Sequence, residues 1–189
     1  KGFTLGDLQY PKDIFMKWSV SEKEAIGIYE VVYDNSNFKD EKWYINTNQS
    51  FAFADGTVTA SYGTATPKAH ADTTWSQDDE DAGLLPSDKS VNDIKTRGLK
   101  YNLIQTLKSQ VAGILNDTDW YITRNTEKST AIPSAISTHR DAVRTKQASM
   151  ETQITNASDT PALETLYTYT TDSDGVQSRP LGELPILES

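Results

Sequence analysis

Residues 115–144, "LNDTDWYITRNTEKSTAIPSAISTHRDAVR", contain an acidic turn, two adjacent aromatic residues and a proline that precedes a helical pattern. Asn116, Asp117 and Asp119 have short side chains that can bond the free backbone N–H groups of a helix end. Pro133 is a residue favoured at the first position of a helix. This stretch therefore predicts a joint between two helices.

Apolar residues recur at helical spacing on both sides of the joint. The helical pattern starts at Val91, and the two helices, each about 24 residues or about 36 Å long, predict an antiparallel hairpin over residues 91–158. The first helix has a wide apolar face of roughly 160°. Such a face favours at least partial docking on the β-rich part, and a second copy could also cover it to give a homo-oligomer. The apolar positions of the two helices are Tyr101, Leu103, Ile104, Leu107, Val111, Ile114 and Leu115, followed by Ile132, Ile136, His139, Val143, Met150, Ile154 and Ala157.

Trp120 is predicted to lie at the elbow, where its large ring would wedge between the helices and fix their angle. Loss of a buried aromatic side chain costs about 3–5 kcal/mol, so we expect Trp120→Ala to destabilise the fold by that amount. Arg124 and Glu127 can pair with each other or bond the exposed carbonyls of the joint.

His139 lies on the apolar stripe of the second helix, which favours a packed core or interface histidine over a functional one. Arg140 and Arg144 are four residues apart and share one side of that helix. We expect them to form a cationic ledge for Asp or Glu of the neighbouring helix.

Residues 1–66 are predicted to be β-rich with one short helix. Residues 21–24 form a capping-box pattern, and Gly27 can end the helix that follows it. Residues 28–33 alternate like a strand, and Asp55-Gly56 joins two alternating runs as a type I′ hairpin turn does. A small antiparallel sheet is the expected result.

Residues 67–90 have no sustained period and are predicted to form an acidic connector that contacts the fold at Trp75 and at residues 84–85. Its carboxylates at positions 78–81 are expected to be solvated rather than to bind a cation, because neighbours on an extended chain point to opposite sides. Residues 159–189 predict a short helix, an edge strand at 167–171 and an extended tail. Asp174-Gly175 predicts a turn, since a calcium loop would lack its key acidic ligands. The whole chain is expected to be one compact α+β unit.

The composition limits the classes of partner and site. With 27 acidic and 18 basic residues the net charge is -9, which disfavours nonspecific binding to nucleic acid or to an anionic membrane. No apolar run approaches the roughly 20 residues of a membrane span, and the first residues lack the apolar core of a signal peptide. The absence of cysteine excludes disulfides, thiolate metal sites and cysteine nucleophiles.

No motif of the sequence points to catalysis, a metal or a cofactor. The two histidines, His70 and His139, are not spaced as metal ligands, and there is no nucleophile elbow or phosphate-binding glycine loop. Two carboxylates could still meet in three dimensions, as in glycosidases. The sequence thus predicts a protein that is not an enzyme and that holds no cofactor.

Two blocks resemble small proteins of tailed bacteriophages that are encoded near tail genes, among them tail-fibre assembly proteins. The first is "GDLQYPKDIFMKWS" followed by "AIGIYEV". The second contains "TDW", an Arg, an "IP" step and "HRDAVR", with His139 where the phage pattern generally has Tyr. The resemblance implies a role in tail or tail-fibre assembly, or as a minor virion component, without known catalytic residues.

Two functions from different classes follow. The first is a non-enzymatic phage protein whose partner is a tail or tail-fibre protein, located in the host cytoplasm during assembly or in the virion. Exposed aromatic residues would anchor such a partner, and the candidates are Trp18, Trp43 and Trp75. The alternative is a small carbohydrate- or surface-binding module, in which sugars stack on aromatic residues of the β-rich part.

Overall fold

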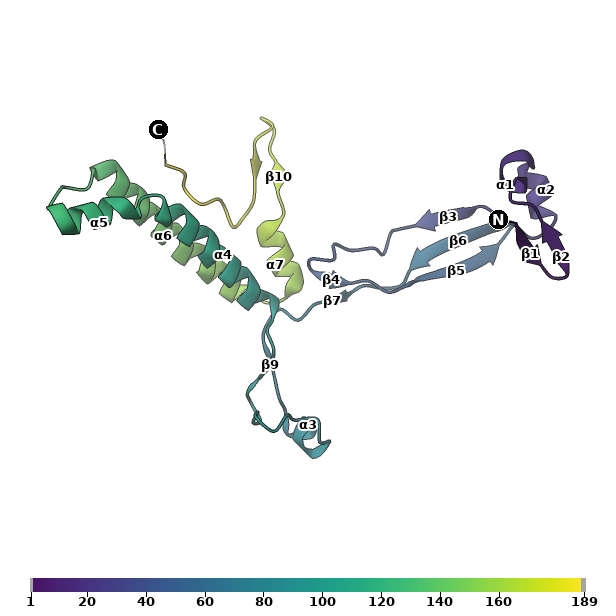
Figure 1. The fold of residues 1–189 in the computed structure, drawn as a ribbon, viewed down its shortest axis with the longest axis horizontal. Coiled ribbons are helices and arrows are strands. Elements are labelled where there is room, and N and C mark those ends of the chain that lie inside the picture. The colour runs from purple at the N-terminus through teal and green to yellow at the C-terminus, as the bar shows by residue number, and fades with distance from the viewer. Residues whose placement is uncertain (1, 188–189) are drawn as a thin grey trace. The chain divides into compact units, whose positions relative to one another are not determined.

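A computed structural model describes residues 2–187 of the chain (Figure 1). It confirms the predicted α+β class. Backbone contacts divide the chain into two compact units, one up to Thr66 and one from Pro67 onward. The boundary falls where the predicted β-rich part ends, at residue 66.

The N-terminal unit contains two very short helices and a set of short strands. Ser19 caps the second helix: its Oγ accepts from the Glu22 N–H at 3.3 Å, while the Glu22 carboxylate accepts from the Ser19 N–H at 2.8 Å. The capping box thus starts at Ser19 rather than at the predicted Ser21. The elements are β1 (Phe3–Leu5), β2 (Leu8–Tyr10), α1 (Ile14–Lys17), α2 (Val20–Glu24), β3 (Val31–Asp34), β4 (Tyr44–Ile45), β5 (Gln49–Ala54) and β6 (Thr57–Tyr62).

The predicted hairpin at Asp55-Gly56 is confirmed, with β5 antiparallel to β6 and positive φ angles of 50° and 77° at the two turn residues. β3 pairs with β6 in parallel, so the strand order is β3-β6-β5 and the sheet is mixed rather than purely antiparallel. Alternation of apolar residues reports which face a side chain takes, and it does not report the direction of a neighbouring strand. The chain between β3 and β6, residues 35–56, includes β4 and β5 and is long enough for a parallel pair.

The second unit contains the long helices, and β7 (Thr66–Pro67) spans the boundary between the units. The segment predicted as an irregular connector is partly regular. Ser76 and Asp79 form a capping box that turns the acidic run into a short helix. Leu84, expected to touch the fold, is exposed. The elements are β8 (Thr73–Thr74), α3 (Gln77–Asp81), β9 (Ile94–Thr96), α4 (Leu99–Asn116), α5 (Asp119–Lys128), α6 (Ser134–Asn156), α7 (Thr160–Tyr167), β10 (Thr170–Thr171) and β11 (Gln177–Ser178).

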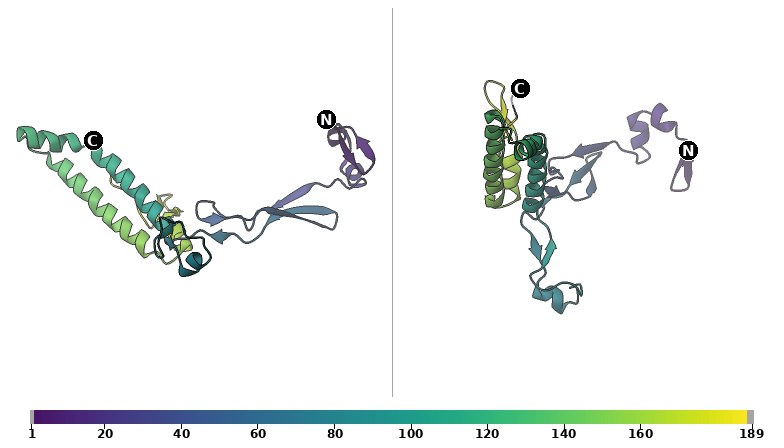
Figure 2. Two further views of the ribbon diagram at one scale, coloured as in Figure 1. Left: turned by 60° about the horizontal axis from the view of Figure 1, so that its bottom comes forward. Right: turned by 60° about the vertical axis from the view of Figure 1, so that its left-hand side comes forward.

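The antiparallel helical hairpin is formed by α4 and α6, which lie side by side in all three views (Figures 1 and 2). It begins at Leu99 rather than at Val91, because β9 pairs with β8 in that stretch. The arms are also unequal: α4 has 18 residues and is followed by the 10 residues of α5, whereas α6 has 23. The chain reverses after Ser129, whose φ of 53° ends α5, and Pro133 precedes α6 as its N-cap rather than as its first residue.

The C-terminal segment begins with α7, which Asp159 caps by accepting the Ala162 N–H at 2.8 Å. The predicted strand at 167–171 is shorter than expected, because α7 continues to Tyr167 and only Thr170–Thr171 pairs with β11. The turn between these strands is confirmed: the Asp172 carboxylate accepts the N–H groups of Asp174 and Val176, each at 2.9 Å. Beyond β11 the chain is irregular, and residues 188–189 of the predicted tail lie outside the described residues.

Candidate functional site

The hairpin packs through one apolar stripe on each helix, as its sequence period predicts. These side chains are nearly inaccessible to water, so the pair α4–α6 has a core of its own. His139, on the same stripe of α6, is buried with them, which agrees with its interpretation as a packed residue. The buried apolar residues of the stripe are Leu107, Val111, Ile136, Val143, Met150 and Ile154.

Arg140 of α6 bonds three groups at the break between α4 and α5. One Nη donates to the Leu115 carbonyl at 2.8 Å and to the Thr118 hydroxyl at 2.6 Å, and the other is 2.8 Å from the Asp119 carboxylate. Leu115 lies in the last turn of α4, where carbonyls lack helical partners and the helix dipole is negative. The guanidinium, in a side chain only 6% exposed, therefore links both helices of the first arm to the second.

The joint is made by only some of the residues predicted for it. Asp119 and Arg140 do meet, whereas Asp117 is exposed. The Thr118 hydroxyl does not cap the start of α5 but donates to the Leu115 carbonyl at the end of α4, at 3.0 Å. Arg144 contributes no ledge, because it is exposed and pairs with Asp141 of its own helix at 3.4 Å. Trp120 is 50% exposed, so it does not wedge between the helices. The prediction was wrong because the direction of α5 after the break decides where its side chains point.

Trp120 instead forms the α5 aromatic cluster together with Tyr121 and Arg124. The two ring centroids are 3.8 Å apart, and the Arg124 guanidinium carbon lies 4.7 Å from the Trp120 centroid and 5.5 Å from that of Tyr121. Arg124 therefore stacks on rings rather than pairing with Glu127. Ile122, on the same helix, is also exposed. Trp120 is the exposed ring of the cluster, and half-buried Tyr121 and Arg124 hold it in place.

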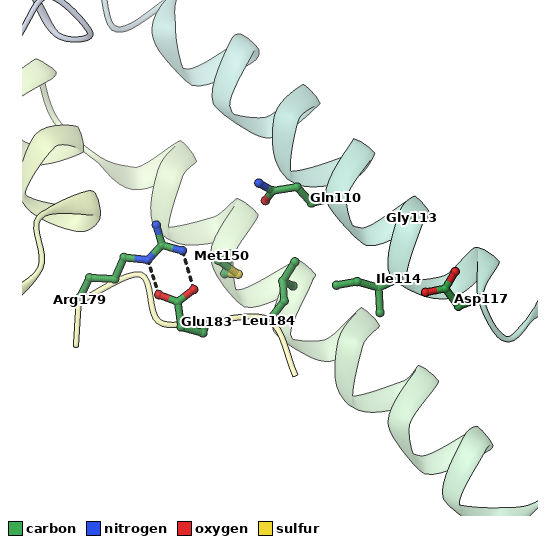
Figure 3. Close-up of a pocket in the computed structure, with 8 residues that line it drawn as sticks. All are labelled: Gln110, Gly113, Ile114, Asp117, Met150, Arg179, Glu183 and Leu184. Atoms are coloured by element: carbon green, nitrogen blue, oxygen red, sulfur yellow. Dashed lines mark hydrogen bonds and ion pairs between the residues drawn. The ribbon is translucent and has the colours of Figure 1, made fainter. Parts of the chain in front are cut away.

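A cavity of about 520 Å³ lies between α4, α6 and the C-terminal segment (Figure 3). Its charged residues include Arg179 and Glu183, which bond each other twice, Nε to Oε1 and Nη2 to Oε2, each at 2.8 Å. Their charges are mutually neutralised, so the pair orders the C-terminal segment. The lining residues are Gln110, Gly113, Ile114, Asp117, Met150, Arg179, Glu183 and Leu184.

Two tyrosines complete this C-terminal network. The Arg179 guanidinium carbon lies 5.5 Å from the Tyr167 ring centroid and 5.1 Å from that of Tyr169. The Tyr169 hydroxyl donates to Glu183 at 2.6 Å, which raises the pKa of Tyr169, whereas burial raises the pKa of Tyr167. Both phenols therefore stay protonated at neutral pH, and the network is structural.

In the N-terminal unit, one face of the sheet is apolar across all three strands. The register aligns Val31, Val58 and Phe53 in one row and Tyr33, Ala60 and Phe51 in the next. These six residues are termed the apolar sheet face. The opposite face carries Ala52, Thr59 and Val32 in one row and Ser50, Ser61 and Asp34 in the other.

The apolar sheet face is largely open to solvent. Phe51, Phe53 and Tyr33 are 65%, 58% and 64% exposed, although Ala60 between them is completely covered. The helices of this unit, α1 and α2, lie beyond the end of the strands rather than over them (Figures 1 and 2). The period-2 pattern of Phe51 and Phe53 signalled this face, but a pattern cannot tell whether another element covers it.

The three tryptophans predicted as partner contacts lie in different environments. Trp43 is buried, so that prediction was wrong for it. Trp18 is half-buried, with its ring 6.1 Å from that of Tyr10, and Trp75 is half-buried under the Lys95 amine at 4.4 Å. Trp120, which had been placed in the joint, is the exposed tryptophan instead.

The acidic run forms hydrogen bonds and an ion pair. Asp79 lies 2.7 Å from the Lys95 amine and accepts the Ser76 N–H at 3.0 Å. The hydrogen bond from Lys95, followed by that from the Ser76 backbone, lowers the pKa of Asp79 to about 2. Among the residues that the structure describes, no group of three or more histidines and carboxylates is arranged to hold a metal ion.

Comparisons with protein-family models, with curated proteins and with solved structures found no match to this chain. Over residues 2–187, none of the helices has both the length and the apolar character that a membrane span requires.

Proposed function

We propose that this protein acts through protein–protein contact, as a factor in the assembly of a phage tail or tail fibre or as a minor structural component of the virion, and not as an enzyme. The exposed α5 aromatic cluster carries this proposal, with a tail or tail-fibre protein as its partner. The phage-like blocks of the sequence supply the class of partner, and the proposed locations are the host cytoplasm during assembly or the virion.

The composition of the cluster suits a contact site. Trp, Tyr and Arg are the residue types that most often carry the binding energy of protein interfaces. Stacking of Arg124 on both rings holds them in place before binding, so little side-chain entropy remains to be lost. Arg140 fixes the start of α5 to α6, which supports the cluster on a rigid element.

The amount of exposed surface also supports a contact role. The accessible surface is 13024 Å², for a chain of 21.0 kDa. A single globular protein of this mass exposes roughly 9,000 Å², and two separate globular units of these two sizes together expose roughly 11,000 Å². The accessible surface exceeds the value for two separate globular units by an area comparable to that of a standard protein interface.

Affinity purification from phage-infected cells tests the proposal. We expect the tagged chain to retain a tail or tail-fibre protein, and Trp120→Ala to weaken that retention at least about 30-fold, as loss of an interface hot spot does. Mass spectrometry of purified virions then separates the two roles: presence marks a virion component, and absence with retained binding marks an assembly factor.

Thr123→Ala is the matched control, because Thr123 is an exposed residue of the same helix whose hydroxyl bonds only to the Asp119 carbonyl, at 3.4 Å. It should bind as the unaltered chain does. A chain that is absent from virions and retains no tail protein would contradict the proposal.

A carbohydrate- or surface-binding module is the second candidate. The exposed ring of Trp120 beside half-buried Tyr121 favours it, since an aromatic face can stack on a sugar ring, although the predicted site was on the β-rich part. There Trp43 is buried and Tyr62 is half-buried against Phe38 at 5.0 Å. A glycan array on which the chain gives a signal that Trp120→Ala abolishes would favour this candidate over the first.

A further inference from the structure

We propose that the apolar sheet face is the interface between two copies of this chain. An amphipathic sheet is stable when its apolar face is buried against another layer. Here Phe51, Phe53 and Tyr33 are each more than half exposed, on adjacent rows of the same face. The proposal concerns a surface separate from the α5 aromatic cluster and does not depend on it.

The apolar sheet face carries no charge that would oppose contact with a second copy. The chain has a net charge of -9, so two copies repel each other unless their contact avoids acidic groups. None of the six residues of the apolar sheet face is charged. The edge strand β5, "QSFAFA", also has no charge and no proline that would keep another copy away.

The available area suits a dimer. With about 200 Å² per aromatic side chain, the exposed parts of the three rings amount to roughly 400 Å² per copy. Half-buried Tyr29, whose ring lies 4.5 Å from that of Phe53, extends the surface together with Val31 and Val58. Two copies therefore bury about 1,000 Å², the area from which specific interfaces begin.

The second unit offers no equivalent surface among its described residues. Its exposed large apolar side chains do not form rows on a sheet. Trp120 and Ile122 lie on α5, Ile186 and Leu187 are neighbours in the C-terminal segment, and the others lie on separate segments: Leu84, Ile94, Tyr101, Tyr169 and Val176. A second copy of the sheet, in contrast, presents an uncharged face of the same size. A two-fold contact of this kind uses the same patch twice and closes without further growth.

Light scattering coupled to size exclusion on the purified full chain tests the proposal. We expect a mass of twice the 21.0 kDa chain at micromolar concentration, and at least about 100-fold weaker association for the double variant Phe51→Ser with Phe53→Ser. Val32→Ser is the control, because Val32 is 53% exposed on the opposite face of the same sheet, and it should remain dimeric.

Hydrogen exchange of the unaltered chain provides a second test that needs no variant. Protection of β5 and β6 should rise with protein concentration if the face is buried between copies. A monomeric unaltered chain, a double variant that still dimerises, or concentration-dependent protection confined to other segments would each overturn the proposal. A monomer whose protected sheet faces its own second unit would show that this unit is the occupant.

Discussion

The helical hairpin and the β3–β6–β5 sheet are both amphipathic, yet only the hairpin completes its own core. The apolar stripe of α4 is closed by α6, and Arg140, a cation inside this unit, has three partners. The sheet instead leaves three aromatic rings open on one face. Stability of the hairpin is therefore internal, whereas the sheet keeps apolar surface available for contact.

The largest expected effect comes from replacing one apolar side chain in each region by alanine and comparing the two losses of stability. Ile154 is completely buried, so Ile154→Ala should lower the free energy of unfolding by about 2–5 kcal/mol, through lost burial and a cavity. Phe53→Ala should change the stability of the monomer by only about 0.5 kcal/mol, as exposed positions do. Hydrogen exchange in increasing urea, at a concentration that keeps the chain monomeric, measures both units separately.

Equal losses at the two positions would show that Phe53 is packed in the monomer, and the comparison would fail. A small loss at Ile154 would show that the stripe of α6 does not hold the hairpin together.

Replacement of Arg140 by alanine should cost about 1.5–3 kcal/mol, the range for hydrogen bonds to a charged group. The Leu115 carbonyl keeps the Thr118 hydroxyl as a donor at 3.0 Å, so the cost comes from the lost charged hydrogen bonds, while Asp119, which is exposed, is resolvated. Urea unfolding of the second unit measures the loss. Arg144→Ala, one turn further on the same helix, should change stability by about 0.5 kcal/mol or less, because its ion pair is exposed.

If Arg140→Ala and Arg144→Ala lowered the free energy of unfolding equally, the contacts of Arg140 would not be what stabilises the joint. Arg140→Lys should recover only part of the stability, since one ammonium cannot reproduce the planar, forked geometry that reaches three groups.

Trp120→Ala is expected to cost about 1 kcal/mol, the value of an exposed aromatic and cation–π contact, and not the 3–5 kcal/mol of a buried ring. The ring contacts Tyr121 and Arg124 but is half exposed. Thermal unfolding of the variant measures this directly. A loss of about 3 kcal/mol or more would place Trp120 back in the joint.

Local patterns predicted the parts of the fold that depend on local chemistry. The helical period identified the stripe of α6, Pro133 marked its beginning, and Asp55-Gly56 identified the β5–β6 turn. They also placed a helix end at residues 116–119, but they did not predict the direction of α5 after that end, which leaves Trp120 half exposed. The parallel pairing of β3 with β6 also depends on long-range contact, which alternation does not encode.

The candidate surfaces were predicted less well than the fold. Arg140 and Arg144 have the same spacing relative to the stripe, and only the position of the α4 break distinguishes the buried arginine from the exposed one. Likewise, the sequence contains Trp43 and Trp120 as similar aromatic residues near polar ones, but the first is core and the second is surface. The exposure of a side chain depends on which other elements pack against it, so the sequence around one residue could not reveal it.

The β8–β9 hairpin with α3 is a third kind of region, because polar contacts take the place of a core. The hydrogen bonds that lower the pKa of Asp79 to about 2, from an ordinary 3.8, favour its ionised form in the folded state. Its stabilisation is therefore complete above pH 3.8 and is lost as the pH falls through about 2.

Titration of the Asp79 carboxyl by NMR should show a pKa of about 2 in the unaltered chain and a shift toward 3.8 in Lys95→Met. Lys89→Met, whose amine lies 3.9 Å from Asp88 in an exposed pair, should leave Asp79 unchanged. If Asp79 already titrates at 3.8 in the unaltered chain, Lys95 does not hold α3 through this ion pair. The hairpin would then lack the polar contact that is proposed to stabilise it in place of a core.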